Sequence, residues 1–178
     1  SASTIRKMQI RRFSGHGVVF SAGSGSVLED SSIITHGGDG VRIVNSANNT
    51  VGGITGVTPG AGCNGACNFI YENEGHGVNI MGASAAGNRV LGNYIGYPDL
   101  SVLGNSGDGV HIENASNNTI GGATAQEGNL IAYNLGYGVT VKAGTGNAIL
   151  RNCIFDNLML GIDLNEDGLR LIVPRQNF

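Results

Sequence analysis

The chain has 178 residues and a formal net charge of −3; 13% of the residues are charged, 40% are hydrophobic and 31 are glycine. The weak acidity and the lack of a basic patch interleaved with aromatics argue against a nucleic-acid partner. No apolar run reaches the roughly 18 residues of a membrane span. Enough apolar residues are present to bury a core, so we expect the glycines to serve turns.

A six-residue phrase, Gly-x-Gly-Val followed by a variable and an apolar residue, recurs along the chain. Its copies span residues 15–20, 38–43, 75–80, 107–112 and 136–141, with a degenerate copy at 159–164. The second glycines, at 17, 40, 77, 109, 138 and 161, are 23, 37, 32, 29 and 23 residues apart. This recurrence predicts a repeat architecture with a base period of 23 residues and insertions in the three middle intervals.

Two further apolar columns precede the phrase. Seven residues before the second glycine stand Ile10, Ile33, Ile70, Ile131 and Ile154, and an insertion displaces the equivalent Ile95. Earlier in each repeat come Ile5, Leu28 (or Val27), Val51, Val90, Ile120 and Ile149. Three such columns predict three short strands per coil. The fold class is therefore all-β, a right-handed parallel β-helix solenoid of about six coils. It forms one domain over residues 1–178, with loops near 52–66, 96–104 and 121–127 and an irregular tail at 165–178.

Asparagines recur in three columns of their own. These are Asn49, Asn88, Asn118 and Asn147; Asn68, Asn93, Asn129 and Asn152; and Asn73, Asn105, Asn134 and Asn157. Stacked coils lie about 4.8 Å apart, so an Asn side chain can bond to the next coil. Asn also tolerates the left-handed backbone of tight turns. The columns predict three asparagine ladders along the solenoid.

The phrases at 92–96, 104–110, 118–122 and 160–168 resemble bacterial right-handed parallel β-helix repeat proteins of the pectate-lyase-like superfamily. The resemblance covers nearly the whole chain and is clearest from 48 to 168. It implies an extracellular or cell-surface location, although no secretion signal is visible at the start of the chain. It does not select a function, because such folds carry lyases, hydrolases, epimerases and adhesins.

Polar residues are expected on one lateral face, where the third strand and the preceding Gly-x-Gly turn expose their side chains. Candidate catalytic residues are His76, Asp108 and His111, and candidate binding residues are Asp39, Arg42, Asn79, Tyr137 and Thr140. Either histidine can act as an acid or a base, Asp108 can orient a histidine, and Arg42 can neutralise a uronate. The inserted loops are expected to wall this face. The competing interpretation is that Asp and His beside glycine are ordinary turn residues.

Two local motifs concern metals and disulfides. Asp163, Asn165 and Asp167 match the first half of an EF-hand loop and predict a partial calcium site. The twelfth position is Pro174 rather than Glu, so a complete EF-hand is excluded. Cys63 and Cys67 predict either a local disulfide or, if further ligands lie nearby, a zinc site; Cys153 has no obvious partner.

Three functions remain open at this point. The first is a module whose lateral face contacts a polysaccharide, for which the exposed aromatics Tyr71, Tyr94, Tyr97, Tyr133 and Tyr137 also offer stacking surfaces. The second is a polysaccharide lyase, hydrolase or epimerase, and the third is a structural spacer in an adhesin. Open solenoid ends predict end-to-end or homo-oligomeric association, or a chain that is part of a longer solenoid.

Overall fold

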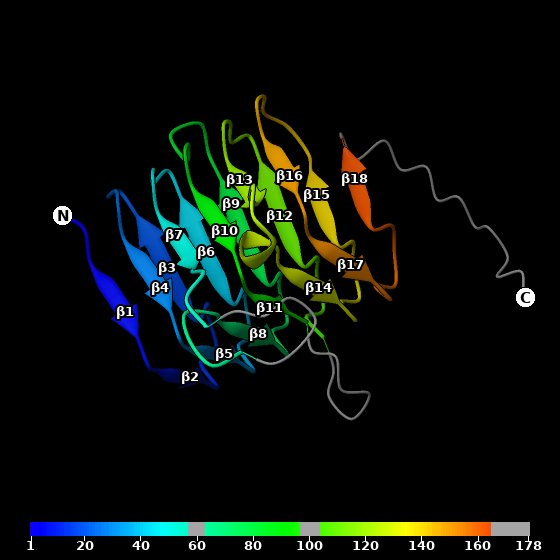
Figure 1. The fold of residues 1–178 in the computed structure, drawn as a ribbon, viewed down its shortest axis with the longest axis horizontal. Coiled ribbons are helices and arrows are strands. Elements are labelled where there is room, and N and C mark those ends of the chain that lie inside the picture. Colours follow the sequence, from blue (N-terminus) through cyan, green and yellow to red (C-terminus); the bar gives the residue numbers. More distant parts are fainter. Residues whose placement is uncertain (57–62, 97–103, 165–178) are drawn as a thin grey trace, which may run out of the picture.

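The computed structural model describes residues 1–56, 63–96 and 104–164, which wind into stacked coils of three strands each (Figure 1). The strands form three six-stranded parallel sheets. Sheet A contains β1 (Thr4–Arg6), β4 (Val27–Glu29), β7 (Thr50–Gly52), β10 (Arg89–Leu91), β13 (Thr119–Gly121) and β16 (Ala148–Leu150). Sheet B contains β2 (Gln9–Arg11), β5 (Ser32–Ile34), β8 (Phe69–Tyr71), β11 (Tyr94–Ile95), β14 (Leu130–Ala132) and β17 (Cys153–Phe155). Sheet C contains β3 (Val18–Ser21), β6 (Val41–Val44), β9 (Val78–Met81), β12 (Val110–Glu113), β15 (Val139–Val141) and β18 (Ile162–Leu164).

The predicted apolar columns form the core. In sheet B, Ile70 pairs with Ile33 on one side and with Ile95 on the other, so the isoleucine displaced in sequence returns to its column. In sheet A, Val90 pairs with Val51 and Ile120, which confirms that the residues between these columns include loops. All six side chains are fully buried. Alternation with period two thus places one residue per strand inside the solenoid.

The three asparagine ladders are confirmed. In each, the side-chain oxygen accepts the backbone N–H of the asparagine one coil earlier, as Asn105 Oδ1 does from Asn73 at 3.3 Å. The side-chain amide donates to the next asparagine and to a backbone carbonyl: Asn105 Nδ2 lies 2.8 Å from Asn134 Oδ1 and 3.0 Å from the Ile70 oxygen. The ladders therefore satisfy backbone groups that are buried at the corners of the coils.

Each ladder continues into the second coil through a residue other than asparagine. Ser26 Oγ accepts the Ser3 N–H at 3.2 Å, and Ser31 Oγ accepts the Met8 N–H at 3.1 Å. In the third ladder His36 takes the position: its Nδ1 accepts the Phe13 N–H at 3.3 Å and its Nε2 lies 3.2 Å from the Ile10 oxygen. A neutral imidazole thus reproduces the acceptor and donor of an asparagine amide.

The insertions leave the solenoid at different corners. Residues 52–66 join β7 to β8, and residues 121–127, which include the 3₁₀ helix η1 (Ala125–Glu127), join β13 to β14. Both connect sheet A to sheet B, so their described residues, 52–56, 63–66 and 121–127, do not wall the polar face of sheet C as expected. The third insertion joins β11 to β12, and most of it (97–103) lies outside the described residues, as does the tail at 165–178.

Cys63 and Cys67 form the predicted disulfide, and Cys153 is an exposed free thiol. Cys67 and Tyr94 are buried together in a small apolar cluster on the outer side of sheet B, with Cys63, Phe69 and Leu130 packed against them. The expectation of an exposed Tyr94 is therefore wrong, because the disulfide-bonded segment covers it.

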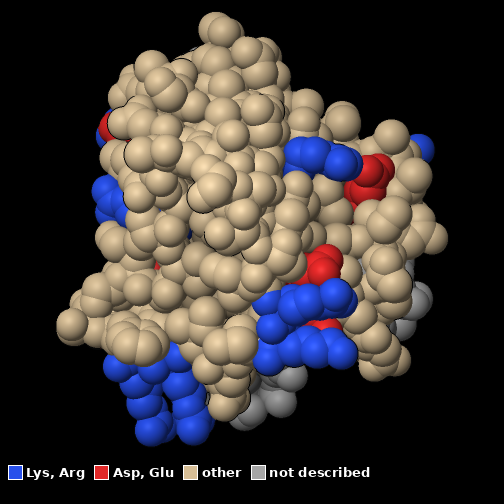
Figure 2. Space-filling view, turned by 90° about the vertical axis from the view of Figure 1, so that its left-hand side faces the viewer, with Lys and Arg blue, Asp and Glu red and all other residues tan. Residues whose placement is uncertain are grey.

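The two ends of the described solenoid expose apolar side chains, including Phe13 and Val19 in the first coil and Leu158 and Leu164 in the last. Seen from the N-terminal end, the surface is largely uncharged, and charged side chains gather toward its margins (Figure 2). Association through these ends stays a prediction. No helical segment among residues 1–56, 63–96 and 104–164 has the length and hydropathy required to cross a bilayer.

His36 is expected to make stability depend on pH. Burial lowers its pKa below 6.5, although the hydrogen bond to Ile10 partly opposes this. The neutral form is therefore favoured in the folded state. Its contribution is complete above pH 6.5 and is lost as the pH falls through the lowered pKa.

The variant His36→Asn restores the ladder residue without a titrating group. We expect the free energy of unfolding, measured with urea between pH 8 and pH 5, to fall more steeply for the wild type than for this variant. Parallel pH profiles for the two proteins would contradict the assignment of His36 as a neutral ladder member.

Candidate functional site

The outer surface of sheet C carries two adjacent columns of polar side chains. The outer row, formed by the middle residues of the strands, contains Arg42, Asn79, His111, Thr140 and Asp163, which are paired in register. The turn column, formed by the middle residues of the Gly-x-Gly turns, contains His16, Asp39, His76, Asp108 and Tyr137. Contacts between the two columns show that the turn side chains also point outward.

The turn column is a fourth side-chain ladder. In this column a side chain accepts the backbone N–H of the member one coil later. The Asp39 N–H donates to His16, the His76 N–H to Asp39 and the Asp108 N–H to His76, each at 2.9 Å, and the Tyr137 N–H donates to Asp108 at 2.8 Å. The first glycine of the phrase makes room for this, because a Cβ on Gly75 would lie 2.5 Å from Asp39 Oδ1. The Asp and His residues of these turns therefore have a structural role, as the competing sequence interpretation expected.

The predicted catalytic residues come together. The His111 Nδ1 lies 2.8 Å from Asp108 Oδ2, and the rings of His76 and His111 stack with centroids 4.4 Å apart and planes at 18°. Burial by itself would raise the pKa of Asp108. The hydrogen bonds from His111 and from the Tyr137 N–H, with the charges of His76 and His111, outweigh it and lower that pKa. Asp108 is therefore an ionised acceptor at neutral pH.

Asp108 selects opposite tautomers in the two histidines. Its carboxylate only accepts, so His111 Nδ1 carries a proton and a neutral His111 has its lone pair on Nε2. Its backbone N–H only donates, so His76 Nδ1 is unprotonated and the proton of a neutral His76 is on Nε2. These tautomers are inferred from the partners of each nitrogen. One ring is thus arranged as a base and its neighbour as a donor.

A related group lies two coils earlier. Arg42 Nη1 is 2.9 Å from His16 Nε2, while His16 Nδ1 faces the Asp39 N–H. A neutral imidazole has one nitrogen lone pair and can accept only one of these two donors. The remaining contacts of the guanidinium are weak acceptors or distant: Met81 Sδ at 2.9 Å and Asp39 Oδ2 at 3.6 Å. The hydrogen-bonding capacity of Arg42 is therefore poorly satisfied.

Within each column the side chains differ in how far they reach the solvent. His16, Arg42 and His76 keep between 27% and 30% of their side-chain surface exposed, whereas His111 keeps 8%. Thr140 is fully buried and does not reach the surface as a binding residue would. Asn79 Oδ1 and Thr140 Oγ1 are buried without a hydrogen-bond partner among the described residues. Asn79 instead supports the site by donating to Asp39 Oδ2 at 3.0 Å.

Comparison with known proteins identifies the fold family. The family model described as a right-handed beta helix region matches residues 1–173. The chain belongs to the right-handed β-helix family. A search of curated proteins gave no match. Among solved structures, the chain is similar to the A-module of the mannuronan C-5 epimerase AlgE4 of Azotobacter vinelandii, with 23% sequence identity and a TM-score of 0.49. The match covers 90% of this β-helix protein but only 45% of that chain.

The cluster of His76, Asp108 and His111 also has the composition of a metal site. One ligand atom from each lies within 4.8 Å of the others. However, the Nδ1 lone pair of His76 is taken by a backbone N–H, and His111 Nδ1 is protonated toward Asp108. A metal bound through these two Nδ1 atoms would displace both hydrogen bonds.

The calcium site predicted at the end of the solenoid stays a prediction. Asp163 is buried at the end of the outer row, beside Thr140 in the adjacent strand. Asn165 and Asp167 lie outside the described residues.

The sequence did not single out His16, although its place in the Gly-x-Gly phrase, equivalent to that of His76, was an available signal.

Asp108 is expected to contribute to stability in a pH-dependent manner. Because its folded pKa is lower than the ordinary 3.8, the contribution is complete above that value and is lost as the pH falls through the lowered pKa. We expect the wild type to be more stable than Asp108→Asn near pH 6. Urea unfolding should show this difference shrinking below about pH 4. A difference that stays constant down to pH 3 would contradict the ionised state of Asp108.

Proposed function

We propose that this protein is an extracellular or cell-surface β-helix module that contacts an acidic polysaccharide through the outer face of sheet C. The supporting observation is the incompletely satisfied guanidinium of Arg42 beside His16. Two N–H donors, of Arg42 and of the Asp39 backbone, face one imidazole acceptor there, and the carboxylate that pairs with the guanidinium, that of Asp39, lies 3.6 Å away, outside hydrogen-bonding distance. A carboxylate of a uronate would supply the missing acceptors, and charge-assisted hydrogen bonds to arginine are strong.

The arrangement of donors above buried carboxylates on sheet C fits the same acidic polysaccharide. The partly exposed groups include two donors, the Arg42 guanidinium and the Nε2–H assigned to His76. The two carboxylates beneath them, Asp39 and Asp108, are buried and already accept backbone and side-chain hydrogen bonds. The face therefore presents the positive charge of Arg42 and an N–H group of His76 on adjacent coils, which stack about 4.8 Å apart. An extended polymer with regularly spaced anionic groups matches that arrangement.

The test is the binding of polygalacturonate and alginate, measured by affinity electrophoresis against a neutral glucan. We expect Arg42→Gln to weaken retention by the acidic polymers about tenfold, as the loss of a charge-assisted hydrogen bond predicts. Arg151→Gln is the matched control, because it removes the same charge from an exposed position after β16. Equal loss in both variants, or no retention of the wild type, would overturn the proposal.

The tautomers selected by Asp108 support a second function, general acid–base catalysis on the bound polysaccharide. His111 Nε2 would accept a proton from the substrate, with Asp108 orienting the ring, and His76 Nε2–H would donate to the oxygen that gains charge. The stacked rings of His76 and His111 supply the acid and the base on adjacent coils. Glu113, whose Oε2 lies 4.0 Å from His111 Nε2, would stabilise the protonated base.

Release of new reducing ends or of unsaturated products from these polymers would reveal such an activity. We expect His111→Ala to abolish it and His76→Ala to reduce it by about 10²-fold or more. His36→Asn, assayed at pH 8, is the control for the loss of a histidine that lies in the core instead of on sheet C. Unchanged rates in both His111→Ala and His76→Ala would eliminate this function.

A further inference from the structure

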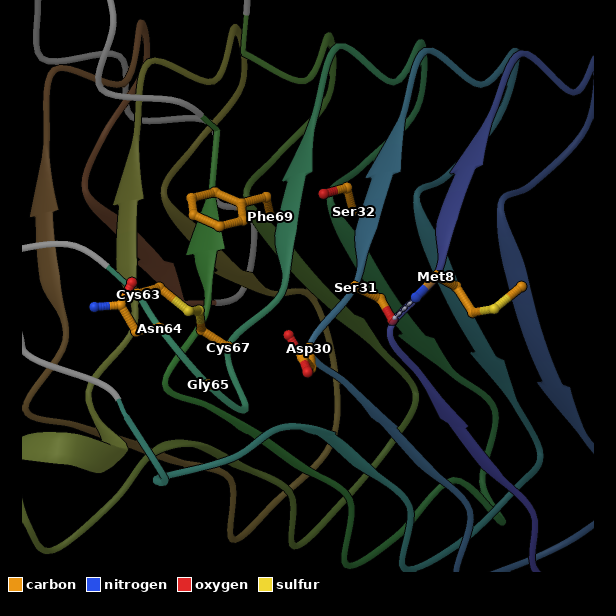
Figure 3. Close-up of a pocket in the computed structure, with 9 residues that line it drawn as sticks. All are labelled: Met8, Asp30, Ser31, Ser32, Cys63, Asn64, Gly65, Cys67 and Phe69. Atoms are coloured by element: carbon orange, nitrogen blue, oxygen red, sulfur yellow. Dashed lines mark hydrogen bonds between the residues drawn. A yellow bond between two sulfur atoms is a disulfide. The ribbon is translucent and has the colours of Figure 1, made fainter.

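The disulfide-closed segment that precedes β8 carries the only asparagine in the sequence that is followed by a glycine, Asn64 before Gly65. Figure 3 shows this segment at one end of a surface pocket on sheet B, with the Asn64 side chain directed away from Asp30 and Met8. Asn64 is exposed, and Gly65 is partly exposed. Solvent therefore reaches both residues of the pair.

An Asn–Gly pair can lose ammonia without an enzyme. Hydroxide removes the proton of the glycine N–H, and the backbone nitrogen attacks Cγ of the asparagine. A C–N bond forms, the bond to the side-chain nitrogen breaks, and ammonia leaves a five-membered succinimide ring. Water opens that ring at either carbonyl and gives an aspartate or an isoaspartate, so one water is consumed and one ammonia released. Glycine favours the attack because it has no side chain to obstruct it.

Neither reacting group is occupied by the fold. The side-chain amide of Asn64 and the N–H of Gly65 have no hydrogen-bond partner among the described residues. The adjacent N–H groups are used instead: that of Asn64 donates to the Gly56 oxygen at 3.1 Å, and that of Ala66 donates to the Thr55 oxygen at 2.7 Å. These two bonds hold the segment on either side of the reacting pair and leave the nucleophile and its target available.

Packing accounts for the glycine of the pair. A Cβ built on Gly65 would overlap the backbone oxygen of Thr55 and lie 3.0 Å from Gly56 Cα. A larger residue at this position would displace the backbone of one strand of the loop. The way in which the segment packs therefore requires the residue that makes Asn64 reactive.

The asparagines elsewhere in the described residues lack this combination. Those of the three ladders hold their amides in hydrogen bonds, as Asn68 Nδ2 does with the Leu28 oxygen at 2.8 Å. Four others are exposed at the corner between sheets C and A, with φ between 47° and 58°, and each precedes a residue that has a side chain. These four are Asn45, Asn48, Asn114 and Asn117.

We propose that Asn64 is a site of spontaneous deamidation, at which the folded protein converts to aspartyl and isoaspartyl forms with water as the only co-reactant. The site goes beyond the polysaccharide contact proposed for sheet C and does not depend on it, because it uses other residues on another sheet and requires no ligand.

The modification changes the charge and the length of the segment. Conversion adds one negative charge to the formal net charge of −3, at the end of a pocket that already contains the Asp30 carboxylate. The isoaspartyl form also inserts one carbon atom into the backbone between Cys63 and Cys67, in the segment that covers Tyr94. Deamidation is therefore an irreversible alteration of the part of the chain that covers sheet B.

The test is incubation of the folded, disulfide-bonded protein at pH 8 and at pH 6, followed by peptide mass spectrometry. A protein-isoaspartate methyltransferase labels the isoaspartyl product. We expect Asn64 to convert at least about tenfold faster than the four exposed asparagines at the other corner. The rate should be lower at pH 6, because less of the Gly65 nitrogen is deprotonated. Conversion of Asn64 no faster than that of Asn114 would overturn the proposal.

Two variants assign the acidic species that ion-exchange chromatography resolves. Asn64→Gln should stop its accumulation, because glutamine would have to close a less favourable six-membered ring. Asn114→Gln is the matched control and should leave the accumulation unchanged. Its left-handed backbone is tolerated by other long side chains in this solenoid, such as Glu72 with φ of 56°. Equal accumulation in both variants would show that another residue is modified.

The reduced protein in urea supplies the intrinsic rate of the Asn–Gly pair. Because the reacting groups have no partners in the fold, we expect the folded rate at Asn64 to stay within about tenfold of the unfolded rate. Conversion that occurs in urea but not in the folded protein would show that the disulfide-closed segment protects Asn64, and would overturn the assignment.

Discussion

The solenoid depends on the hydrogen bonds that its buried asparagines make with the backbone at the corners of the coils. A coil of three short strands turns three times, and each turn would leave N–H and C=O groups without partners in an environment that excludes water. Asn93 shows how one side chain meets this need: its oxygen accepts the Asn68 N–H at 3.2 Å, and its amide reaches the Val51 oxygen at 2.9 Å. Leaving one such group unpaired costs about 1–3 kcal/mol, so the ladders limit which residues can stand at the corners.

The candidate site on sheet C is built from the same device. The turn column accepts backbone N–H groups as the asparagines do, but with side chains that titrate and that contact a second polar row on their outer side. Asp108 uses one carboxylate oxygen for the Tyr137 N–H and the other for His111. A residue of this kind serves the scaffold and the site together. Its replacement must therefore be judged by stability and function in parallel, and the exposed Arg42 is the cleaner probe of binding.

The periodicity of the sequence was sufficient for the strands, the inward columns and the ladders, because a strand alternates with period two and every coil repeats the same register. It could not indicate that Thr140 is buried while Arg42 is partly exposed, since both occupy the same row and only their neighbours differ. Nor could it predict the ladder positions of Ser31 and His36, which lack the amide that marked the columns. The periodicity also could not predict the path of the insertions. The Cys63–Cys67 segment turns toward sheet B and covers Tyr94.

The tautomers of His76 and His111 follow from the one-coil offset between adjacent strands. Asp108 lies one coil after His76 and in the same coil as His111, so it meets the first ring with its backbone and the second with its carboxylate. Backbone N–H and carboxylate are opposite in hydrogen-bonding sense, and the two rings must therefore be opposite as well. The earlier pair breaks this pattern because Arg42 stands where His111 does, and a guanidinium cannot accept. The same repeat position thus holds a histidine that donates to a carboxylate in one place and, two coils earlier, a guanidinium that faces an imidazole.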